Sequence, residues 1–155
     1  MLCSTTNSVS FGPPFRVPKQ PKSTADGHSW LDESQKARIL IVDDHEIVRS
    51  GLAALLETRW DICGEAGDGI EAIEKVRELK PDLVLLDLSM PVMSGTAALK
   101  AIRATSRQVK ILVLSIHDSE VVVKLAETIG ADGFVSKRSS GEHLKEVIAV
   151  LLGGE

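Results

Sequence analysis

Five polar residues stand directly after short apolar runs, where the carboxyl ends of buried strands are expected. They are Asp43, Asp44, Asp87, Ser115 and Lys137. A carboxylate in such a place cannot enter the core without a large desolvation cost, so it should emerge at the edge of the sheet. In open α/β sheets, ligands bind at that edge. The five residues are therefore our candidates for chemistry.

Three carboxylates in one crevice repel one another unless a cation lies among them. A site of hard oxygen ligands suits Mg²⁺, or the similar ion Mn²⁺, which keeps several waters. We expect Asp44 and Asp87 to bind this ion directly and Asp43 to bind it mainly through water. The backbone carbonyl of Ser89 could supply a further oxygen.

Carboxylates, a divalent ion, a hydroxyl and an ammonium group together have the composition of a phosphate site. Phosphoryl transfer then gives each group a role. Asp87 is the candidate nucleophile, whose oxygen would attack the phosphorus of a donor in line and form an aspartyl phosphate. Lys137 would hold one phosphoryl oxygen by its positive charge, and Ser115 would donate a hydrogen bond to another.

From Arg38 onward, short apolar runs alternate five times with amphipathic stretches of helical period. The expected strands cover residues 39–42, 61–66, 83–86, 111–114 and 133–136. The expected helices begin near residue 46, cover 69–80, 95–105 and 118–129, and end with one around 144–151. Asp118 is the expected N-cap of the fourth helix, and Gly130 ends that helix.

Each expected helix has an apolar face that should pack on the sheet. The residues of these faces are Ile47, Val48, Leu52, Leu55 and Leu56, then Ile70, Ile73, Val76 and Leu79, then Leu99 and Ile102, then Val121 to Val123, and finally Leu144, Val147, Ile148 and Leu151. Five β–α repeats with short links imply a parallel sheet with helices on both faces. We predict an α/β fold with a flavodoxin-like, doubly wound sheet of five strands in the order 2-1-3-4-5. The first and third strands are neighbours in that order, so the three carboxylates should converge.

Length and composition suit one domain of ordinary size. The chain has 155 residues and a formal net charge of −4, which argues against a nucleic-acid-binding surface within it. We expect a disordered arm over residues 1–36, where prolines stand among small polar residues without periodicity, and one folded domain over residues 37–155. The two cysteines give no disulfide framework, and the longest apolar run, Val147 to Leu152, is too short to cross a membrane. A cytoplasmic protein is expected.

Taken as an ordered set, these motifs resemble the receiver domains of two-component response regulators over about residues 37–152. The resemblance lies in the acidic pair Asp43-Asp44, LDLSMP around Asp87, Ser115, Phe134 and Lys137. The run VLSIHDSE, and Arg138 rather than a proline after the lysine, resemble the LuxR/FixJ-type subfamily, which carries a helix-turn-helix after the receiver. Contact with DNA is therefore expected only through a domain that this chain does not contain. The chain would be a receiver fragment or would act by protein contact alone.

The resemblance implies that a sensor histidine kinase or a phosphotransfer protein supplies the phosphoryl group, and that the domain catalyses its own phosphorylation and dephosphorylation. Ser115 would move toward the phosphoryl group, and Phe134 would turn into the space that it leaves. This would reshape the surface of the fourth helix, fifth strand and fifth helix to control an output such as transcription, with or without a homodimer. Ser89 and His117 stand where the family tunes the lifetime of the phosphoryl group.

Rival functions can be tested against single positions. A haloacid-dehalogenase-type phosphatase needs a second Asp where Ser89 stands, and a nucleotide- or flavin-binding domain needs a glycine-rich loop where residues 43–46 stand. A receiver that acts without phosphorylation, as a protein-interaction module, is the remaining alternative. The four histidines, His28, His45, His117 and His143, show no metal-ligand spacing and are expected at the surface or in loops.

Overall fold

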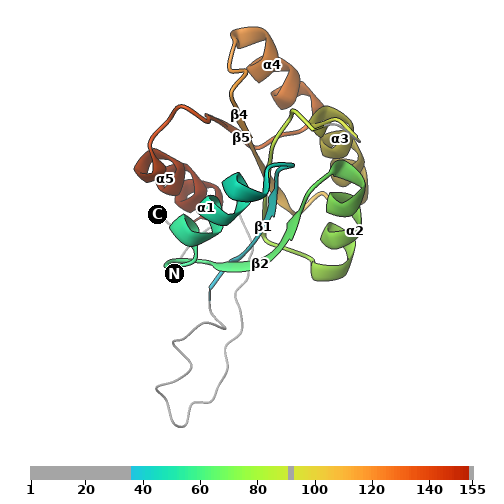
Figure 1. The fold of residues 1–155 in the computed structure, drawn as a ribbon. Coiled ribbons are helices and arrows are strands. Elements are labelled where there is room, and N and C mark those ends of the chain that lie inside the picture. Colours follow the sequence, from blue (N-terminus) through green and yellow to red (C-terminus); the bar gives the residue numbers. More distant parts are fainter. Residues whose placement is uncertain (1–35, 91–92, 154–155) are drawn as a thin grey trace, which may run out of the picture. The chain divides into compact units, whose positions relative to one another are not determined.

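The structure is a computed structural model that describes residues 36–90 and 93–153 (Figure 1). The arm predicted over residues 1–36 lies outside these ranges apart from Lys36. Strands and helices alternate along the described chain. Their bounds are β1 (Arg38–Val42), α1 (Glu46–Leu56), β2 (Asp61–Ala66), α2 (Gly69–Leu79), β3 (Leu83–Leu86), α3 (Gly95–Thr105), β4 (Lys110–Ser115), α4 (Glu120–Ile129), β5 (Gly133–Ser136) and α5 (Gly141–Leu151). Among these helices, none is long and apolar enough to cross a membrane.

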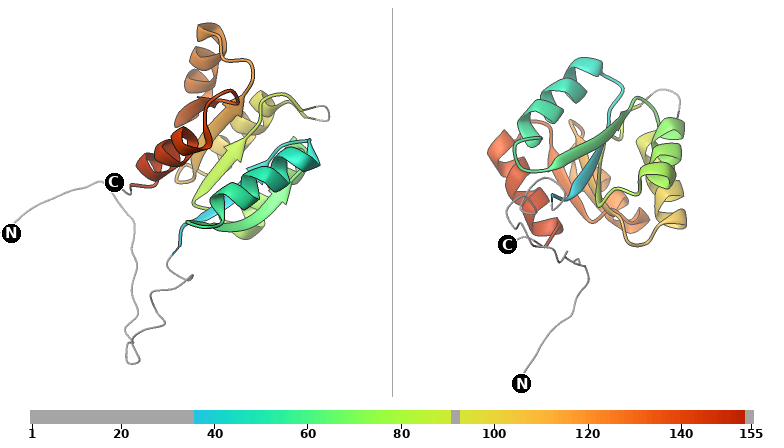
Figure 2. Two further views of the ribbon diagram at one scale, coloured as in Figure 1. Left: turned by 60° about the vertical axis from the view of Figure 1, so that its left-hand side comes forward. Right: turned by 90° about the horizontal axis from the view of Figure 1, so that it is seen from below.

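The strands form one parallel sheet in the order β2-β1-β3-β4-β5, which confirms the predicted order and the flavodoxin-like fold. Helices α1 and α5 pack on one face of this sheet, and α2, α3 and α4 pack on the other (Figure 1 and Figure 2). In the pairing of β1 with β3, Val42 stands opposite Leu86. The two strands therefore end side by side, at the edge where the candidate carboxylates follow.

The central strands are apolar on both faces. All four residues of β3 are buried. In β1, Ile39 and Ile41 pack in the cluster with α1 and α5, whereas Leu40 and Val42 pack in the cluster with α2, α3 and α4. Alternate side chains of a strand point to opposite faces, so a strand covered on both sides has no place for a polar side chain. After Arg38 at its first position, β1 has no polar side chain, and the next one is that of Asp43, directly after the strand.

The helix faces predicted from periodicity include six buried residues and three exposed ones. The buried residues are Leu56, Val76, Leu99, Ile102, Leu144 and Ile148. In contrast, Ile47, Ile70 and Val121 are 86%, 49% and 77% exposed. At about 100° per residue, Ile47 lies on the opposite side of α1 from the buried Leu56. In α2 the small Ala72, rather than Ile70, approaches the sheet.

The predicted cap of the fourth helix is also wrong. Helix α4 begins after Ser119, whose hydroxyl accepts a hydrogen bond from the backbone N–H of Val122 at 3.4 Å. Asp118 instead accepts from Arg138 at 3.1 Å, and a hydrogen bond with Ser136 is the main cause that lowers the pKa of Asp118. Gly130 ends the helix with φ of 133°, as predicted. Helix α2 ends at Leu79, one residue earlier than predicted.

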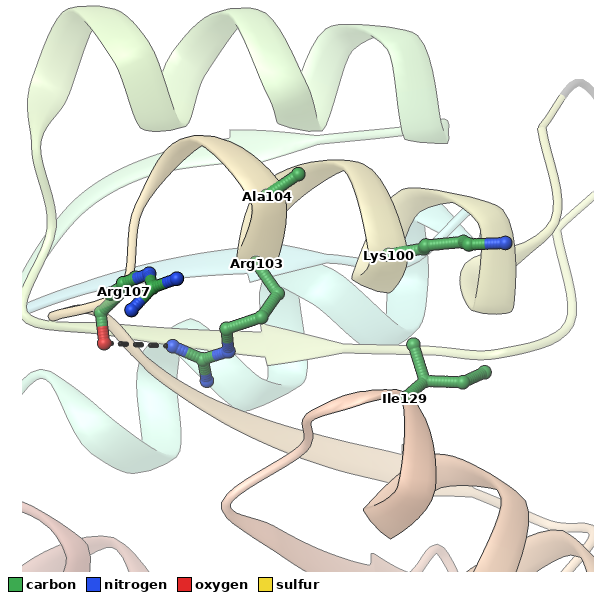
Figure 3. Close-up of a pocket in the computed structure, with 5 residues that line it drawn as sticks. All are labelled: Lys100, Arg103, Ala104, Arg107 and Ile129. Atoms are coloured by element: carbon green, nitrogen blue, oxygen red, sulfur yellow. Dashed lines mark hydrogen bonds between the residues drawn. The ribbon is translucent and has the colours of Figure 1, made fainter.

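Arg103 of α3 joins its helix to the sheet edge opposite the candidate site. Its guanidinium donates to the carbonyl oxygens of Gly130 at 3.1 Å and Val109 at 2.9 Å. It also donates to Asp132 Oδ2 at 2.6 Å. Arg103 also lines an open groove of about 450 Å³. Figure 3 shows its guanidinium donating to the backbone carbonyl of Arg107 beside this groove. Because its donors are engaged inside the protein, we assign Arg103 a structural role.

We expect Arg103→Met to lower the free energy of unfolding by about 2 kcal/mol, because the substitution leaves part-buried carbonyls and the Asp132 carboxylate without their charged donor. Urea unfolding followed by far-UV circular dichroism measures the change. Arg107→Met is the matched control, since the Arg107 side chain is exposed and Arg103 contacts its backbone carbonyl, which the substitution keeps. That control should stay within about 0.5 kcal/mol of the parent. Equal midpoints for both variants would contradict the structural role.

Candidate functional site

Two buried carboxylates leave adjacent strands at the carboxyl edge of the sheet. Asp43 follows β1 and Asp87 follows β3, and their exposed fractions are 1% and 4%. The backbone N–H of Asp87 donates to the carbonyl of Val42 at 3.0 Å, which continues the strand pairing up to the acidic residues. The backbone N–H of Asp43 donates to Ala66 at the end of β2 in the same way, at 3.0 Å. The sheet hydrogen bonds therefore fix the backbone of both carboxylates.

Lys137 brings a positive charge from the end of β5 to these carboxylates. Its Nζ lies 2.7 Å from Oδ2 of Asp43 and 3.6 Å from Oδ1 of Asp87. The Lys137 backbone is held in turn by a hydrogen bond to the Ser115 carbonyl at 2.9 Å. Residues 94 positions apart in the chain thus form one charged cluster. We call the place where the side chains of Asp43, Asp44, Asp87 and Lys137 meet the acidic crevice.

The acidic crevice has the composition and an unsatisfied atom that suit a divalent cation. Asp43, Asp44, His45 and Asp87 each offer one ligand atom, and these atoms lie within 4.8 Å of one another. Among the described residues, Oδ1 of Asp44 is buried without a hydrogen-bond partner. A buried acceptor without a donor is costly, whereas a cation would satisfy it. The residues present therefore fit the predicted Mg²⁺ or Mn²⁺.

Burial and neighbouring charge oppose each other at Asp87. Desolvation is the largest cause, and it raises the pKa of this carboxyl group above its ordinary value. A hydrogen bond from the Ser89 backbone N–H, at 3.2 Å, and the charge of Lys137 act in the lowering direction. The charges of Asp43 and Asp44 add to the rise. The charge of Lys137 therefore does not fully offset the effect of burial and of the two neighbouring carboxylates on Asp87.

His45 lies exposed in the loop after β1, as predicted, but it also contacts the acidic pair, which the sequence analysis did not foresee. Its side chain is 65% exposed, but Nδ1 lies 3.2 Å from Asp43 Oδ1 and 3.1 Å from Asp44 Oδ1. Its backbone N–H also donates to Asp43 Oδ1 at 2.8 Å. A spacing rule for separate metal ligands could not find it, because His45 directly follows the acidic pair in the same loop. His117 is exposed in the loop after β4, and His143 is exposed on α5.

A second residue missed by the sequence analysis supports the acidic pair. Arg49 of α1 donates to the backbone carbonyl of Asp43 at 2.6 Å and to Glu65 Oε1 of β2 at 3.1 Å. These bonds tie the loop after β1 to both the helix and the neighbouring strand. The pairing joins residues 16 positions apart, so periodicity within one element carries no signal for it.

Of the remaining predicted site residues that the structure describes, only Ser89 makes a hydrogen bond to a carboxylate of the acidic crevice. Ser115 is fully buried, and its Oγ accepts a hydrogen bond from the His117 backbone N–H at 3.0 Å. Ser89 is exposed, and its N–H faces Asp87. Phe134 of β5 is half-buried against the cluster under α2, α3 and α4. It also lines an open groove of about 400 Å³ with Val147 and other residues of α5.

Comparison with known proteins matches this chain to one family. The family model described as the response regulator receiver domain matches residues 39–149. A curated relative, the transcriptional regulatory protein LnrK of Bacillus subtilis, is 40% identical over 120 residues, which cover 76% of this chain and 54% of the relative. The chain spans about half the length of the curated relatives it matches.

Solved structures of receiver domains and response regulators share this fold. A LuxR-family two-component response regulator from an Aurantimonas species has a TM-score of 0.74 at 36% identity, with 78% of this chain and 88% of that chain covered. The signal receiver domain of the response regulator NarL from Mycobacterium tuberculosis has a TM-score of 0.73 at 32% identity, with coverage of 77% and 98%.

Proposed function

This chain belongs to the response regulator receiver domain family of two-component signalling, and from this we propose that Asp87 accepts a phosphoryl group from a sensor histidine kinase or a phosphotransfer protein. An oxygen of Asp87 attacks the phosphorus, a new O–P bond forms, and the P–N bond of the donor phosphohistidine breaks with its electron pair left on the imidazole nitrogen. The placement of Asp87 carries the proposal, because it lies beside two carboxylates and a lysine at the ligand-binding edge.

The acidic crevice supplies groups for each charge in this transfer. Asp43, Asp44 and Asp87, with the Ser89 backbone carbonyl, would hold Mg²⁺, which when bound offsets charge on the moving phosphoryl group. The Nζ of Lys137, already 3.6 Å from Asp87, is placed to pair with a phosphoryl oxygen. In the transfer it would exchange its present contact with Asp43 for that oxygen.

The response would reach the rest of the protein through Ser115 and Phe134. Ser115 would give up its bond from the His117 N–H and turn its hydroxyl toward the phosphoryl group, and Phe134 would fill the space left behind. The groove that Phe134 shares with α5 would then change shape. We propose that this α4-β5-α5 face, alone or in a homodimer, controls an output domain such as a transcription regulator. His117 and Ser89, beside the phosphoryl position, would set its lifetime.

The proposal is tested by incubation of the full chain with acetyl phosphate and Mg²⁺, followed by intact-mass measurement. A phosphoryl adduct is expected for the parent, and none for Asp87→Asn. Asp82→Asn is the matched control, because Asp82 precedes the same strand at its amino end and accepts from the Arg38 N–H, far from the acidic crevice. It should keep the adduct. Chelation of the divalent ion before acetyl phosphate is added should prevent the adduct in both the parent and Asp82→Asn.

The same measurement decides against the alternative function. A receiver that acts as an interaction module without phosphorylation would give no adduct in the parent, and this result would overturn the proposal. An adduct that persists in Asp87→Asn would place the acceptor at another residue. A cytoplasmic location belongs to the proposal as well, since the donor histidine kinase phosphorylates its partner there.

A further inference from the structure

We propose that His45 is an additional metal ligand of the acidic crevice, and that it gives this crevice a preference for imidazole-binding transition-metal ions such as Co²⁺ and Ni²⁺. The inference rests on the proposed function only in that both use an ion held by Asp43 and Asp44. It concerns the identity of the ion and not the transfer to Asp87. It starts from the position of one ring nitrogen.

The loop backbone fixes the His45 ring over the acidic pair. The residue is the N-cap of α1 in an extended conformation, and its side chain makes no capping bond to the helix. Its backbone N–H donates to Asp43 Oδ1 at 2.8 Å, which closes a tight turn after β1. The ring is therefore turned away from the helix and toward the two carboxylates, where Nδ1 lies close to one oxygen of each.

The distances suit ligands of one ion. With bonds of about 2.1 Å, two ligand atoms at right angles around a metal lie about 3.0 Å apart. Nδ1 of His45 lies 3.2 Å from Asp43 Oδ1 and 3.1 Å from Asp44 Oδ1. A single ring hydrogen can serve only one of these nearly equidistant oxygens, and Asp44 Oδ1 accepts no hydrogen bond from the described residues. A shared ion would satisfy all three atoms together.

Neither Asp87 nor Lys137 occupies the side of the Asp43 carboxylate that faces His45. Asp87 contributes the remaining atom of the group that lies within 4.8 Å. Lys137 contacts Oδ2 of Asp43, whereas His45 faces Oδ1 of the same carboxylate. The ammonium group therefore does not occupy the place where the imidazole and the carboxylates meet.

One nitrogen among oxygen ligands changes which ions bind well. Mg²⁺ prefers oxygen ligands and keeps several waters, so it gains little from an imidazole. Affinity for a nitrogen ligand rises from Mn²⁺ through Co²⁺ to Ni²⁺. Loss of His45 should lower the binding affinities for Co²⁺ and Ni²⁺ by about tenfold or more. It should change the affinity for Mg²⁺ by less than about threefold.

An ion pair is the competing account of His45, and it predicts the opposite sign. A protonated imidazole would repel any cation from the acidic crevice. Its removal would therefore raise the affinities for Mg²⁺ and Co²⁺ together. The direction in which the Co²⁺ affinity changes on removal of His45 therefore distinguishes a metal ligand from a repelling charge: the affinity falls in the first case and rises in the second.

The experiment titrates the full chain with Mg²⁺, Co²⁺ and Ni²⁺ by calorimetry, without a phosphoryl donor. His45→Ala should lower the preference for Co²⁺ over Mg²⁺ by about tenfold. If His45→Ala fails to fold, His45→Asn takes its place in the experiment, because asparagine is a good N-cap and offers an oxygen ligand. His45→Asn should retain Mg²⁺ binding. His143→Ala is the control, because that exposed ring stands on α5 beside Glu146.

Pulsed electron paramagnetic resonance of bound Mn²⁺ gives a direct readout. The parent and His143→Ala should show coupling to an imidazole nitrogen, and His45→Ala should lose it. An unchanged preference with no nitrogen coupling in the parent would overturn the inference. A parent that binds Co²⁺ through nitrogen but forms no adduct at Asp87 would overturn the proposed function and leave this inference standing. A phosphoryl adduct at Asp87 without nitrogen coupling from His45 would overturn this inference and leave the proposed function standing.

Discussion

Replacement of Gly95 by alanine is expected to lower the free energy of unfolding by about 3 kcal/mol and to slow phosphorylation of Asp87 by about 100-fold. A Cβ at this first residue of α3 would lie 2.3 Å from the carbonyl oxygen of Asp87 and 2.3 Å from Cα of Leu88. Both are backbone atoms, so no side-chain rotation can relieve the contact. The substitution must move either the start of α3 or Asp87, the proposed phosphoryl acceptor.

The contact is close because the helix begins directly against the loop after β3. The backbone N–H of Gly95 donates to the carbonyl of Leu88 at 2.9 Å, and this bond draws the two segments together. A shift of about 1 Å in a reacting group is enough to cost about 100-fold in rate. The stability is measured by urea unfolding, and the rate by intact mass with acetyl phosphate, well below the unfolding midpoint.

Gly51 offers a matched control for this substitution. It lies inside α1 with no atom within 4 Å of an added Cβ. Gly51→Ala should therefore raise the free energy of unfolding by about 0.5–1 kcal/mol and leave the phosphorylation rate unchanged. If Gly95→Ala behaved like Gly51→Ala, the close approach between α3 and Asp87 would be contradicted.

Gly95 also shows which structural features could be predicted from the sequence and which could not. The sequence predicted that a helix begins at Gly95, and α3 begins there. The strands were predictable for a similar reason, since runs such as Leu83 to Leu86 are buried on both faces and can belong only to the centre of a covered sheet. The steric need for glycine was not predictable, because it depends on a segment that folds back from seven residues earlier.

Helix faces were predicted less well, and the residues show why. Ile47 and Val121 are apolar but exposed, because a helix on a sheet buries only a narrow stripe. In α4 that stripe is centred on the small Ala126. Hydrophobicity alone gives such an alanine less weight than a neighbouring valine. Contacts between distant elements, such as Arg49 with Glu65, had no signal in the pattern of either element.

Lys137→Ala is expected to change three measured quantities, and not all in the same direction. In the absence of divalent ions, the free energy of unfolding should fall by about 3 kcal/mol, because the buried Asp43 carboxylate loses its partner at 2.7 Å. Mg²⁺ should bind about tenfold tighter, since the three carboxylates then face the ion without a competing charge. Mg²⁺ should in turn restore part of the lost stability by mass action.

Phosphorylation of the same variant should be about 100-fold slower, because the phosphoryl oxygen loses a preorganised positive charge. The adduct that forms slowly should not alter the α4-β5-α5 face, which can be followed by amide hydrogen exchange before and after acetyl phosphate. Urea unfolding, Mg²⁺ titration and intact mass give the other readouts. Partner binding or hydrogen exchange that responded as in the parent would count against coupling through Lys137.

Arg138→Ala separates the specific role of Lys137 from a general loss of charge at the end of β5. Arg138 is the next residue, but its side chain is 70% exposed and pairs with Asp118 at 3.1 Å, away from the acidic crevice. This control should leave stability, Mg²⁺ binding and phosphorylation near the parent values. A purely structural role for Lys137 would weaken Mg²⁺ binding and slow phosphorylation together. Tighter binding with slower transfer can arise only if the lysine lies in the acidic crevice and acts on the phosphoryl group itself.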